Sequence, residues 1–256
     1  MKLIVNADDF GLSESVNNGI VECFKAGIVT STTIMMNQEG VHHAIDLYKQ
    51  GLVPEIGLHF TVTSGKPLSP PAQVPTLINE HGYFLDKNTM LSHHVNPDEV
   101  YQELLVQYNA ALNAGLDINH IDTHHFAGVF APLKAAFVRF SNDCGIPVRR
   151  VDTCVRGQGT LQVPTTDAFD LSFFDEGATE ANFKQQVLKY KEAYPDGLIE
   201  FMCHPSADKN IEALRAVTGY VEKRAAEREI LTSPELKSWL TQNGVESVGF
   251  NALSSM

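Results

Sequence analysis

Short apolar runs alternate with amphipathic stretches along most of the chain. Residues 3–5 form an apolar run typical of a buried strand, and the run stops at the polar residues 6–9. Ser13 then offers a helix-capping hydroxyl, and Glu14 places a negative charge in the first turn, where it suits the helix dipole. Gly27 ends this predicted helix. The inner face of the helix recurs at spacings of three and four residues: Val16, Ile20, Cys23 and Phe24.

The same alternation predicts about seven strand–helix units in one domain that spans residues 1–256. Repeated βα order favours a parallel sheet covered on both faces by helices. The sequence shows no internal repeat and no linker. We expect strands at 3–5, 29–36, 55–60, 119–123, 146–149, 169–174, 198–202 and 245–250, and helices at 13–27, 40–49, 96–115, 132–142, 179–194, 211–228 and from 234 onward.

One long stretch, residues 61–95, breaks this periodicity. It contains four prolines and two glycines, and it is too long for a plain connection between a strand and a helix. Such a segment is either disordered or functional. We expect an irregular βα loop that acts as a lid or as a wall of the substrate site.

Titratable side chains follow several of the predicted strands at their carboxyl ends. Asp8 and Asp9 come after the first strand, His59 closes the third, His124 follows the fourth and His204 follows a late one. In a (β/α) barrel these ends converge on one mouth. In an open doubly wound sheet, strand ends so far apart in order seldom meet. The pattern therefore favours an α/β barrel with one site at its mouth.

Charge and composition limit the partners. The chain has 31 acidic and 19 basic residues and a formal net charge of −12, which repels nucleic acid and anionic membranes and suits a neutral substrate. No apolar run approaches the ~20 residues needed to cross a bilayer, and residues 1–5 are too short for a secretory signal. The four cysteines lie far apart and are expected to be reduced thiols. We therefore expect a cytoplasmic protein.

The adjacent aspartates Asp8 and Asp9 are candidates for metal binding and proton transfer. Two neighbouring carboxylates repel each other, so they persist where a cation or a proton partner separates their roles. Neighbouring side chains point in different directions on extended backbone, so one can ligate a metal while the other faces water or substrate. The alternative is an Asx-type turn that caps the helix at Ser13, although such a turn needs only one aspartate.

Histidines complete a possible metal site. An Asp-His-His set is a common shell for a divalent ion and leaves positions open for water. His59 is one candidate, and one of the neighbours His124 and His125 is the other, because adjacent side chains on a strand point in opposite directions. One of these two histidines faces the mouth and the other faces a wall, where His125 is a candidate for substrate binding. Asp122 could accept a hydrogen bond that fixes an imidazole tautomer. A satisfied core histidine at position 59 and a strand-end salt bridge at Asp122 remain alternatives.

Three further residues are candidates for the reaction or for substrate binding. His204 titrates near neutrality and could give a proton to a leaving amine, or it could be a turn residue before Pro205. Arg149 or Arg150, after a short strand, could orient Asp8 or the substrate. Lys66 lies in a Gly-Lys-Pro segment that suggests a close backbone approach but does not form a phosphate loop.

Six segments, taken together and in this order, resemble the YdjC-like carbohydrate deacetylases, a family that includes chitooligosaccharide deacetylase. Six matches in order are far more specific than any one of them. They extend from residue 6 to about residue 205. The segments are Asn-Ala-Asp-Asp-Phe-Gly at 6–11, Gly-Ile-Val-Thr-Ser-Thr-Thr at 27–33, Gly-Leu-His-Phe at 57–60, Gly-Lys-Pro-Leu at 65–68, His-Ile-Asp-Thr-His-His at 120–125 and Met-Cys-His-Pro at 202–205.

This resemblance implies a distorted TIM-like (β/α) barrel that removes acetyl groups from N-acetylated sugars. It also implies a divalent ion, usually magnesium, whose ligands here are Asp9, His59 and His124. Asp8 is then the base and His204 a candidate acid. The family often continues its second histidine motif as His-x-His-x-His, whereas Phe, Ala and Gly follow His125 in this chain. The donor types suit zinc, manganese and cobalt at least as well as magnesium.

Two other functions remain open. The first is another metal-dependent barrel hydrolase or isomerase; an isomerase needs further carboxylate ligands, for which Glu200 is the obvious late-strand candidate. The second is a catalytically silent sugar-binding module that keeps a metal for structure, and the presence of both Asp8 and His204 argues against it. The expected partner is a small acetylated sugar or oligosaccharide, and a homodimer is left open.

Overall fold

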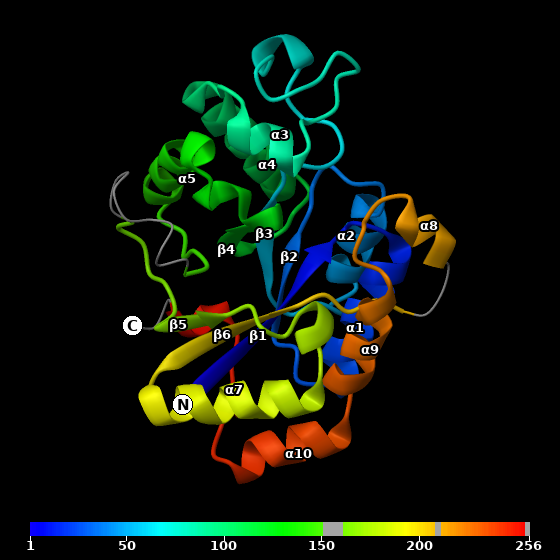
Figure 1. Cartoon of the computed structure of the whole chain (residues 1–256), viewed down its shortest axis with the longest axis vertical. Helices are drawn as coiled ribbons and strands as arrows, with labels where there is room; N and C mark the ends of the chain where they lie inside the picture. The colour runs from blue at the N-terminus through cyan, green and yellow to red at the C-terminus, as the bar shows by residue number, and fades with distance from the viewer. Residues whose placement is uncertain (151–160, 208–210, 254–256) are drawn as a thin grey trace.

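A sheet of seven parallel strands forms the centre of the molecule (Figure 1). The computed structural model describes residues 1–150, 161–207 and 211–253. The strand order is β4-β3-β2-β1-β6-β5, and β7 pairs with the start of β1. The strands are β1 (Lys2–Phe10), β2 (Ser31–Ile34), β3 (Ile56–Phe60), β4 (Ile118–Thr123), β5 (Ala168–Asp170), β6 (Leu198–Cys203) and β7 (Glu246–Ser247).

Helices surround this sheet. In Figure 1, α4 and α5 lie on one side, α1, α2 and α9 on the other, and α7 and α10 below. Side-chain oxygens cap several helices. Ser13 accepts a hydrogen bond from the N–H of Val16, as the sequence predicts, and Thr179 accepts one from the N–H of Asn182. The helices are α1 (Glu14–Ala26), α2 (Val41–Lys49), α3 (Lys87–Ser92), α4 (Pro97–Asn113), α5 (Ala131–Cys144), α7 (Glu180–Ala193), α8 (Ile211–Arg215), α9 (Glu222–Leu231) and α10 (Pro234–Gln242).

The sheet is curled into a half-barrel rather than a regular closed barrel. Within the described residues, no strand pairing joins β4 to β5. The segment predicted as a strand at 146–149 lies in this gap: Val148 forms a parallel bridge with Ile121, and its N–H donates to the carbonyl of Pro164 at 3.1 Å. The prediction of a distorted α/β barrel is confirmed, and its irregularity lies on this side.

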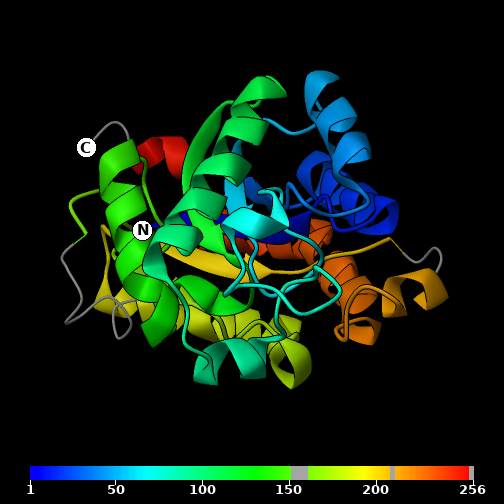
Figure 2. The same ribbon diagram turned by 90° about the horizontal axis from the view of Figure 1, so that it is seen from above.

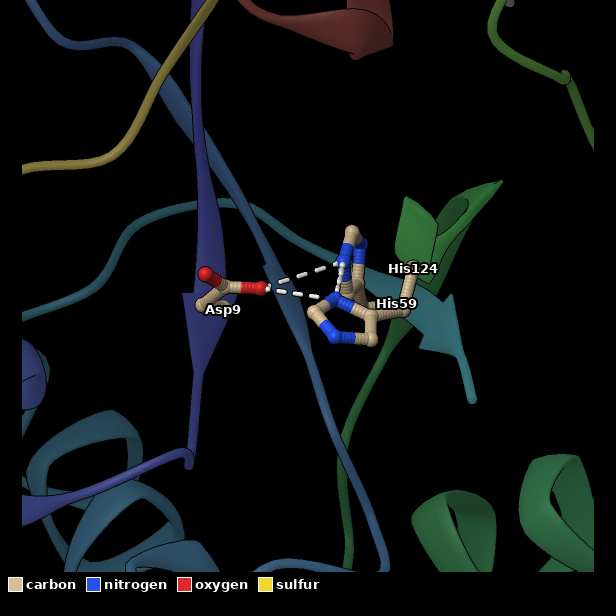
Figure 3. A group of neighbouring side chains, drawn as sticks. All are labelled: Asp9, His59 and His124. Atoms are coloured by element: carbon tan, nitrogen blue, oxygen red, sulfur yellow. Dashed lines mark hydrogen bonds and ion pairs between the residues drawn. The ribbon is translucent and has the colours of Figure 1, made fainter. Parts of the chain in front are cut away.

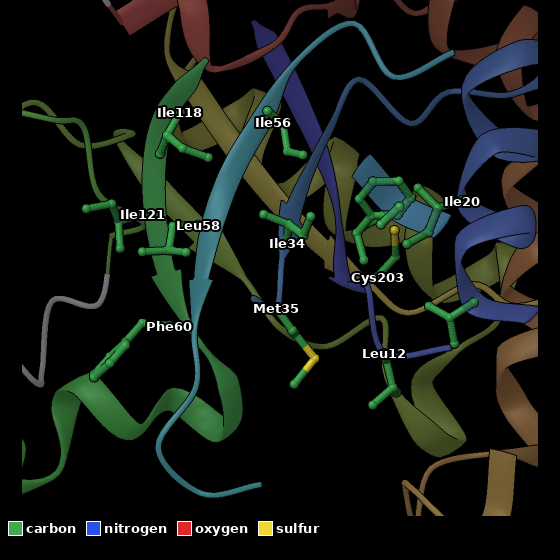
Figure 4. Close-up of a cluster of buried hydrophobic side chains, with 14 of the residues drawn as sticks. Leu12, Ile20, Ile34, Met35, Ile56, Leu58, Phe60, Ile118, Ile121 and Cys203 are labelled. Atoms are coloured by element: carbon green, nitrogen blue, oxygen red, sulfur yellow. The ribbon is translucent and has the colours of Figure 1, made fainter. Parts of the chain in front are cut away.

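The core lies between the curled sheet and the helices that cover it. Residues 3–10 of β1 are all buried, as expected for a central parallel strand covered on both faces. Neighbouring strands and α1 contribute the rest of the apolar cluster in Figure 4, whose labelled side chains are Leu12, Ile20, Ile34, Met35, Ile56, Leu58, Phe60, Ile118, Ile121 and Cys203.

The structure corrects several predicted boundaries. The first strand does not stop at residue 5 but continues through the polar residues to Phe10, because partners in the site satisfy their polar groups. The helix predicted at 211–228 is divided into α8 and α9. The strand predicted at 169–174 ends at Asp170, and the strand predicted at 245–250 is reduced to β7.

The segment 61–95 contains more regular structure than its sequence predicts. It includes the 3₁₀ turn η1 (Pro71–Gln73), a bridge between Ile78 and Phe84, and α3. In Figure 1 the cyan part of this segment lies at the top, above α4. In Figure 2 it lies on the viewer's side of the strands. Its role as a lid or substrate wall stays a prediction.

No helix in the described part of the chain combines the length and the apolar character that a membrane span requires.

Candidate active site

An irregularity at the end of β1 separates the two adjacent aspartates. The register between β1 and β2 shifts between Ala7 and Phe10, and Asp9 has a φ of 70°, in the left-handed region that non-glycine residues rarely adopt. Both Asp8 and Asp9 are buried. Because of the bulge, their carboxylates have different partners. Strain of this kind is characteristic of functional sites.

Asp9, His59 and His124 come together as the sequence predicts they could (Figure 3). Oδ1 of Asp9 lies 3.3 Å from Nε2 of His59 and 3.2 Å from Nδ1 of His124. The two imidazole nitrogens are 3.3 Å apart. The three atoms form a nearly equilateral triangle, supplied by β1, β3 and the turn after β4.

The geometry of this triangle fits a divalent ion. Ligand bonds of ~2.0–2.2 Å in octahedral or tetrahedral geometry place neighbouring ligand atoms ~2.8–3.6 Å apart, which agrees with the triangle. Oδ1 of Asp9 is buried and receives no hydrogen bond of normal geometry from the part of the chain that the structure describes, although a buried carboxylate oxygen needs a partner. A cation bound to it would satisfy this oxygen. The identity of the ion does not follow from these donors.

Asp122 orients His59 through the ring nitrogen that is not part of the triangle. Its Oδ1 lies 2.7 Å from Nδ1 of His59, which leaves Nε2 directed at the triangle. Burial lowers the pKa of His59, but the negative charge of Asp122 outweighs it and raises the pKa to about 10. A cation would therefore replace a proton on this ring. A second set, formed by Asp8, His59 and Asp122, is also close enough to hold an ion, but Arg149 already binds both of its carboxylates.

Arg149 holds Asp8 in a bidentate ion pair. Its two terminal nitrogens each donate to one oxygen of Asp8 at 2.7 Å, and Nε donates to Glu200 at 2.6 Å. Burial alone would raise the pKa of Asp8, but the guanidinium lowers it to about 2. Asp8 is therefore ionised at neutral pH. Of the two roles considered for Arg149, its position fits the orientation of Asp8, because the side chain is buried and does not line the cavity.

Arg224, on α9, holds the other aspartate. Its Nη2 donates to Oδ2 of Asp9 at 2.5 Å, which leaves Oδ1 for the imidazole triangle. Burial would raise the pKa of Asp9, but the charge of Arg224 and the nearby ring nitrogens of the two histidines keep it well below its usual value. Arg224 was not predicted. It lies in an amphipathic helix, and nothing in the local sequence distinguishes it from a solvated surface arginine.

His204 follows β6, which lies on the opposite side of β1 from the strand β3 that carries His59. Its Nε2 lies 3.9 Å from Oδ2 of Asp8, and its Nδ1 is buried and finds no hydrogen-bond partner among the described residues. Burial lowers the pKa of His204 to about 4, so the ring is neutral at pH 7. The backbone N–H of His204 donates to Glu227 of α9, which ties the turn after β6 to that helix.

One cavity of about 390 Å³ contains these groups. Lys66, a predicted substrate contact, does not line this cavity; its ammonium group lies over the ring of Tyr83. His125 lines the cavity in a left-handed conformation, and its Nδ1 lies 3.0 Å from Oγ1 of Thr63. The individual roles assigned to these residues stay predictions. The lining residues are Asp8, Asp9, His59, Lys87, Thr123, His124, His125, Phe126, Leu171, Phe174, Met202, His204, Thr218, Gly219, Tyr220 and Arg224.

Comparison with known proteins places this arrangement in a family. The model of the YdjC-like protein family matches residues 2–242. A chitooligosaccharide deacetylase of Serratia marcescens is 37% identical over 248 residues, which are 94% of this chain and 95% of that protein. A carbohydrate deacetylase of Halalkalibacterium halodurans is 38% identical over 244 residues, or 94% of this chain and 99% of that protein.

Two solved structures share the fold of this chain. A protein of Enterococcus faecalis, named provisionally as a cellobiose-phosphate cleavage protein, is 29% identical and superposes with a TM-score of 0.90 over 98% of each chain. A lactam utilization protein of Thermus thermophilus, 14% identical with a TM-score of 0.56 over 97% of this chain and 100% of that chain, shares the fold alone. With the family model matched over nearly the whole chain and full-length relatives above 30% identity, this chain is a member of the YdjC-like protein family.

Proposed function

We propose that this protein hydrolyses the acetamide of N-acetylated carbohydrates to acetate and an amino sugar, with a divalent metal ion held by Asp9, His59 and His124. The observation that carries the proposal is the triangle of ligand atoms, which opens into the same cavity as Asp8 and His204. Relatives that are named carbohydrate and chitooligosaccharide deacetylases, and that match the chain along nearly its full length, support the substrate class.

A divalent ion in this triangle would polarise the acetamide carbonyl and increase the acidity of a bound water. The resemblance of the sequence to its family favours magnesium. Carboxylate and imidazole donors also suit zinc, manganese and cobalt, so ion restoration has to decide between them.

Asp8 is the proposed general base. It is ionised and buried beside the ligand triangle, so one of its oxygens can accept the proton of the attacking water. The bidentate pair with Arg149 holds this carboxylate in one orientation. Orientation of this kind removes the need to reorganise the base during the reaction.

His204 is the proposed general acid. It lines the same cavity as His59, and its Nε2 lies 3.9 Å from Oδ2 of Asp8. Because its ring is neutral at pH 7, it must first take up a proton before it protonates the departing sugar nitrogen. The proximity of Asp8 provides a source for that proton. Reprotonation of His204 is therefore part of each catalytic cycle in this proposal.

Acetate release tests the proposal directly. Protein depleted of metal is incubated with N-acetylglucosamine and with the fully N-acetylated forms of chitobiose and chitotriose. Each divalent ion is then restored singly, and the acetate released is measured. We expect acetate only when an ion is present, and none from His59→Ala or His124→Ala, which should also lose metal binding in calorimetry. If no acetylated sugar yields acetate with any ion, the proposal is wrong.

The name of the Enterococcus neighbour suggests a second assay, for cleavage of a phosphorylated disaccharide. Glycosidic cleavage ordinarily needs a protonated carboxylic acid beside the bond. Asp8 and Asp9 both have lowered pKa values and are held by arginines, so neither fits that role. We expect no glucose release from cellobiose phosphate. Fractionation of cells tests the expected cytoplasmic location. Sedimentation of the purified protein tests whether it forms a homodimer.

A further inference from the structure

Two large apolar side chains are exposed at the mouth of the cavity. Leu171 is 55% exposed and Phe174 is 39% exposed, and both line the cavity. They lie on the connection that leaves the sheet after β5, in the stretch where the sequence predicts a longer strand. Exposed apolar groups that adjoin a polar site commonly mark a surface that a ligand covers.

Tyr220 holds Phe174 in place from one side. The two rings are stacked, with centroids 4.2 Å apart and an interplanar angle of 24°. The hydroxyl of Tyr220 accepts a hydrogen bond from the N–H of Asp175 at 3.0 Å and donates to Glu227 at 2.5 Å. Because Tyr220 covers one face of Phe174, the opposite face is the one available to a ligand. These contacts fix the position of Phe174 without any ligand.

The aromatic pair also adjoins the proposed acid. The ring centroid of His204 lies 5.4 Å from that of Phe174 and 5.7 Å from that of Tyr220, with both rings edge-to-face to it. A group bonded to the nitrogen that His204 would protonate therefore lies in the same cavity that Phe174 lines. In an N-acetylated sugar, that group is the pyranose ring.

We propose that Phe174, backed by Tyr220 and flanked by Leu171, is the platform on which the pyranose ring of the substrate lies. This inference rests on the proposed deacetylase function and identifies how the sugar is recognised. A pyranose with equatorial substituents has a face of axial C–H groups, and these carry partial positive charge toward the negative face of an aromatic ring. The platform therefore selects a sugar acetamide over an acetamide that lacks such a ring.

Steady-state kinetics of Phe174→Ala test the platform. We expect KM for chitobiose to rise roughly 3- to 10-fold, as estimated for the loss of one aromatic contact, with kcat nearly unchanged, because the contact is equally present before and during the reaction. Phe174→Trp should restore the wild-type KM. Tyr194→Ala is the matched control, since Tyr194 is 40% exposed but does not line the cavity.

A binding measurement separates this inference from the proposed activity. Trp239 is the single tryptophan of the chain, so Phe174→Trp in a Trp239→Phe background places the only indole on the platform. In metal-depleted protein, titration with chitobiose should change the emission of this indole, whereas N-methylacetamide at the same concentration should not.

Three outcomes are distinct. A fluorescence change without acetate release from the wild-type protein supports the platform and contradicts the proposed activity. Acetate release with an unchanged KM in Phe174→Ala, together with a silent indole, overturns the platform alone. An equal response to N-methylacetamide also overturns it, because the pyranose would then not be what the ring recognises.

Discussion

At positions 8 and 9, two chemically identical side chains acquire different surroundings from one backbone irregularity. The left-handed φ of Asp9 turns its carboxylate toward His59 and His124, while that of Asp8 meets Arg149. Each aspartate thus has its own arginine, which keeps both ionised in a buried site. A pair of carboxylates without these cations would hold at least one proton.

The first prediction separates the roles of these aspartates. We expect Asp8→Asn to lower kcat by roughly 10²- to 10⁴-fold, the contribution of a well-placed general base, while metal affinity is retained. Asp9→Asn should instead weaken metal binding itself. Isothermal titration with the active ion and acetate release from chitobiose measure the two effects. Loss of metal from Asp8→Asn, with metal retained in Asp9→Asn, would mean that the roles are reversed.

The second prediction concerns the buried arginine of the site. Arg149 pairs with Asp8, Asp122 and Glu200, so Arg149→Met leaves three buried carboxylates without their cation. We expect the free energy of unfolding to fall by about 3–5 kcal/mol, measured by urea denaturation. Arg139→Met is the control, because its pair with Asp98 is exposed and is expected to contribute less than about 1 kcal/mol. Equal effects of the two substitutions would contradict this account.

At the scale of elements, α4 organises the long segment that follows β3. Oε1 and Oε2 of Glu103 accept hydrogen bonds from the backbone N–H groups of Leu68 and Ser69, each at 2.9 Å, and Gln107 binds both backbone groups of Thr61. These bonds replace the ladder that a strand would have given. The segment is ordered by side chains of a helix that follows it in the chain, so no local pattern within 61–95 predicts its structure.

The third prediction tests this anchorage. In Glu103→Gln, an amide NH₂ replaces one of the two accepting oxygens and meets a backbone N–H that can no longer be satisfied. We expect a loss of about 1–3 kcal/mol in the free energy of unfolding and faster proteolysis within 61–95. Limited digestion with chymotrypsin, which has sites at Tyr83 and Phe84, followed by mass spectrometry locates the cleavage. Glu80→Gln, an exposed change of the same kind in that segment, should leave the digestion rate unchanged.

Over the whole molecule, the site is assembled from elements that are distant in the chain. Asp9 comes from β1, His59 from β3, His124 from the turn after β4, His204 from the end of β6 and Arg224 from α9. The parallel order of the strands brings their carboxyl ends to one mouth. Stability and chemistry are therefore coupled, because the same buried charges serve both.

The fourth prediction follows from one of these charges. Burial raises the pKa of Glu227 to about 7 from its ordinary 4.5, so the folded protein holds a proton that the unfolded chain releases. Stability from this group is present below pH 4.5 and is lost as the pH rises toward 7. The contribution amounts to about 3 kcal/mol. Glu227→Gln should remove this pH dependence. The free energy of unfolding of the variant, relative to that of the wild type, should therefore rise between pH 4.5 and 7.

Urea denaturation of both proteins across this pH range measures the difference. Gln keeps an acceptor for the N–H of His204, so the contact with the turn after β6 is retained. Glu229→Gln, exposed on the same helix, is the control and should shift stability equally at both ends of the range. A parallel pH dependence in Glu227→Gln and the wild type would contradict the prediction.

The candidate site could be predicted as far as its residues follow strands. Asp8, Asp9, His59, His124 and His204 all stand where an apolar run ends, and parallel topology brings such positions together. Other members of the site carry no comparable signal. Lys87, Phe174, Tyr220 and Arg224 lie on helices and connections whose local patterns are those of ordinary surface or core positions.

The sequence by itself determined the alternation of strands and helices, the parallel sheet and the set of polar residues at its carboxyl end, because periodicity and capping are local properties of the chain. Only the tertiary structure decided the bulge at Asp9, the opening of the barrel between β4 and β5, and which arginine neutralises which aspartate. The pairing of the arginines with the aspartates depends on contacts between residues that are separated by 141 and by 215 positions in the chain. Packing selects among such contacts, and no local pattern records the choice.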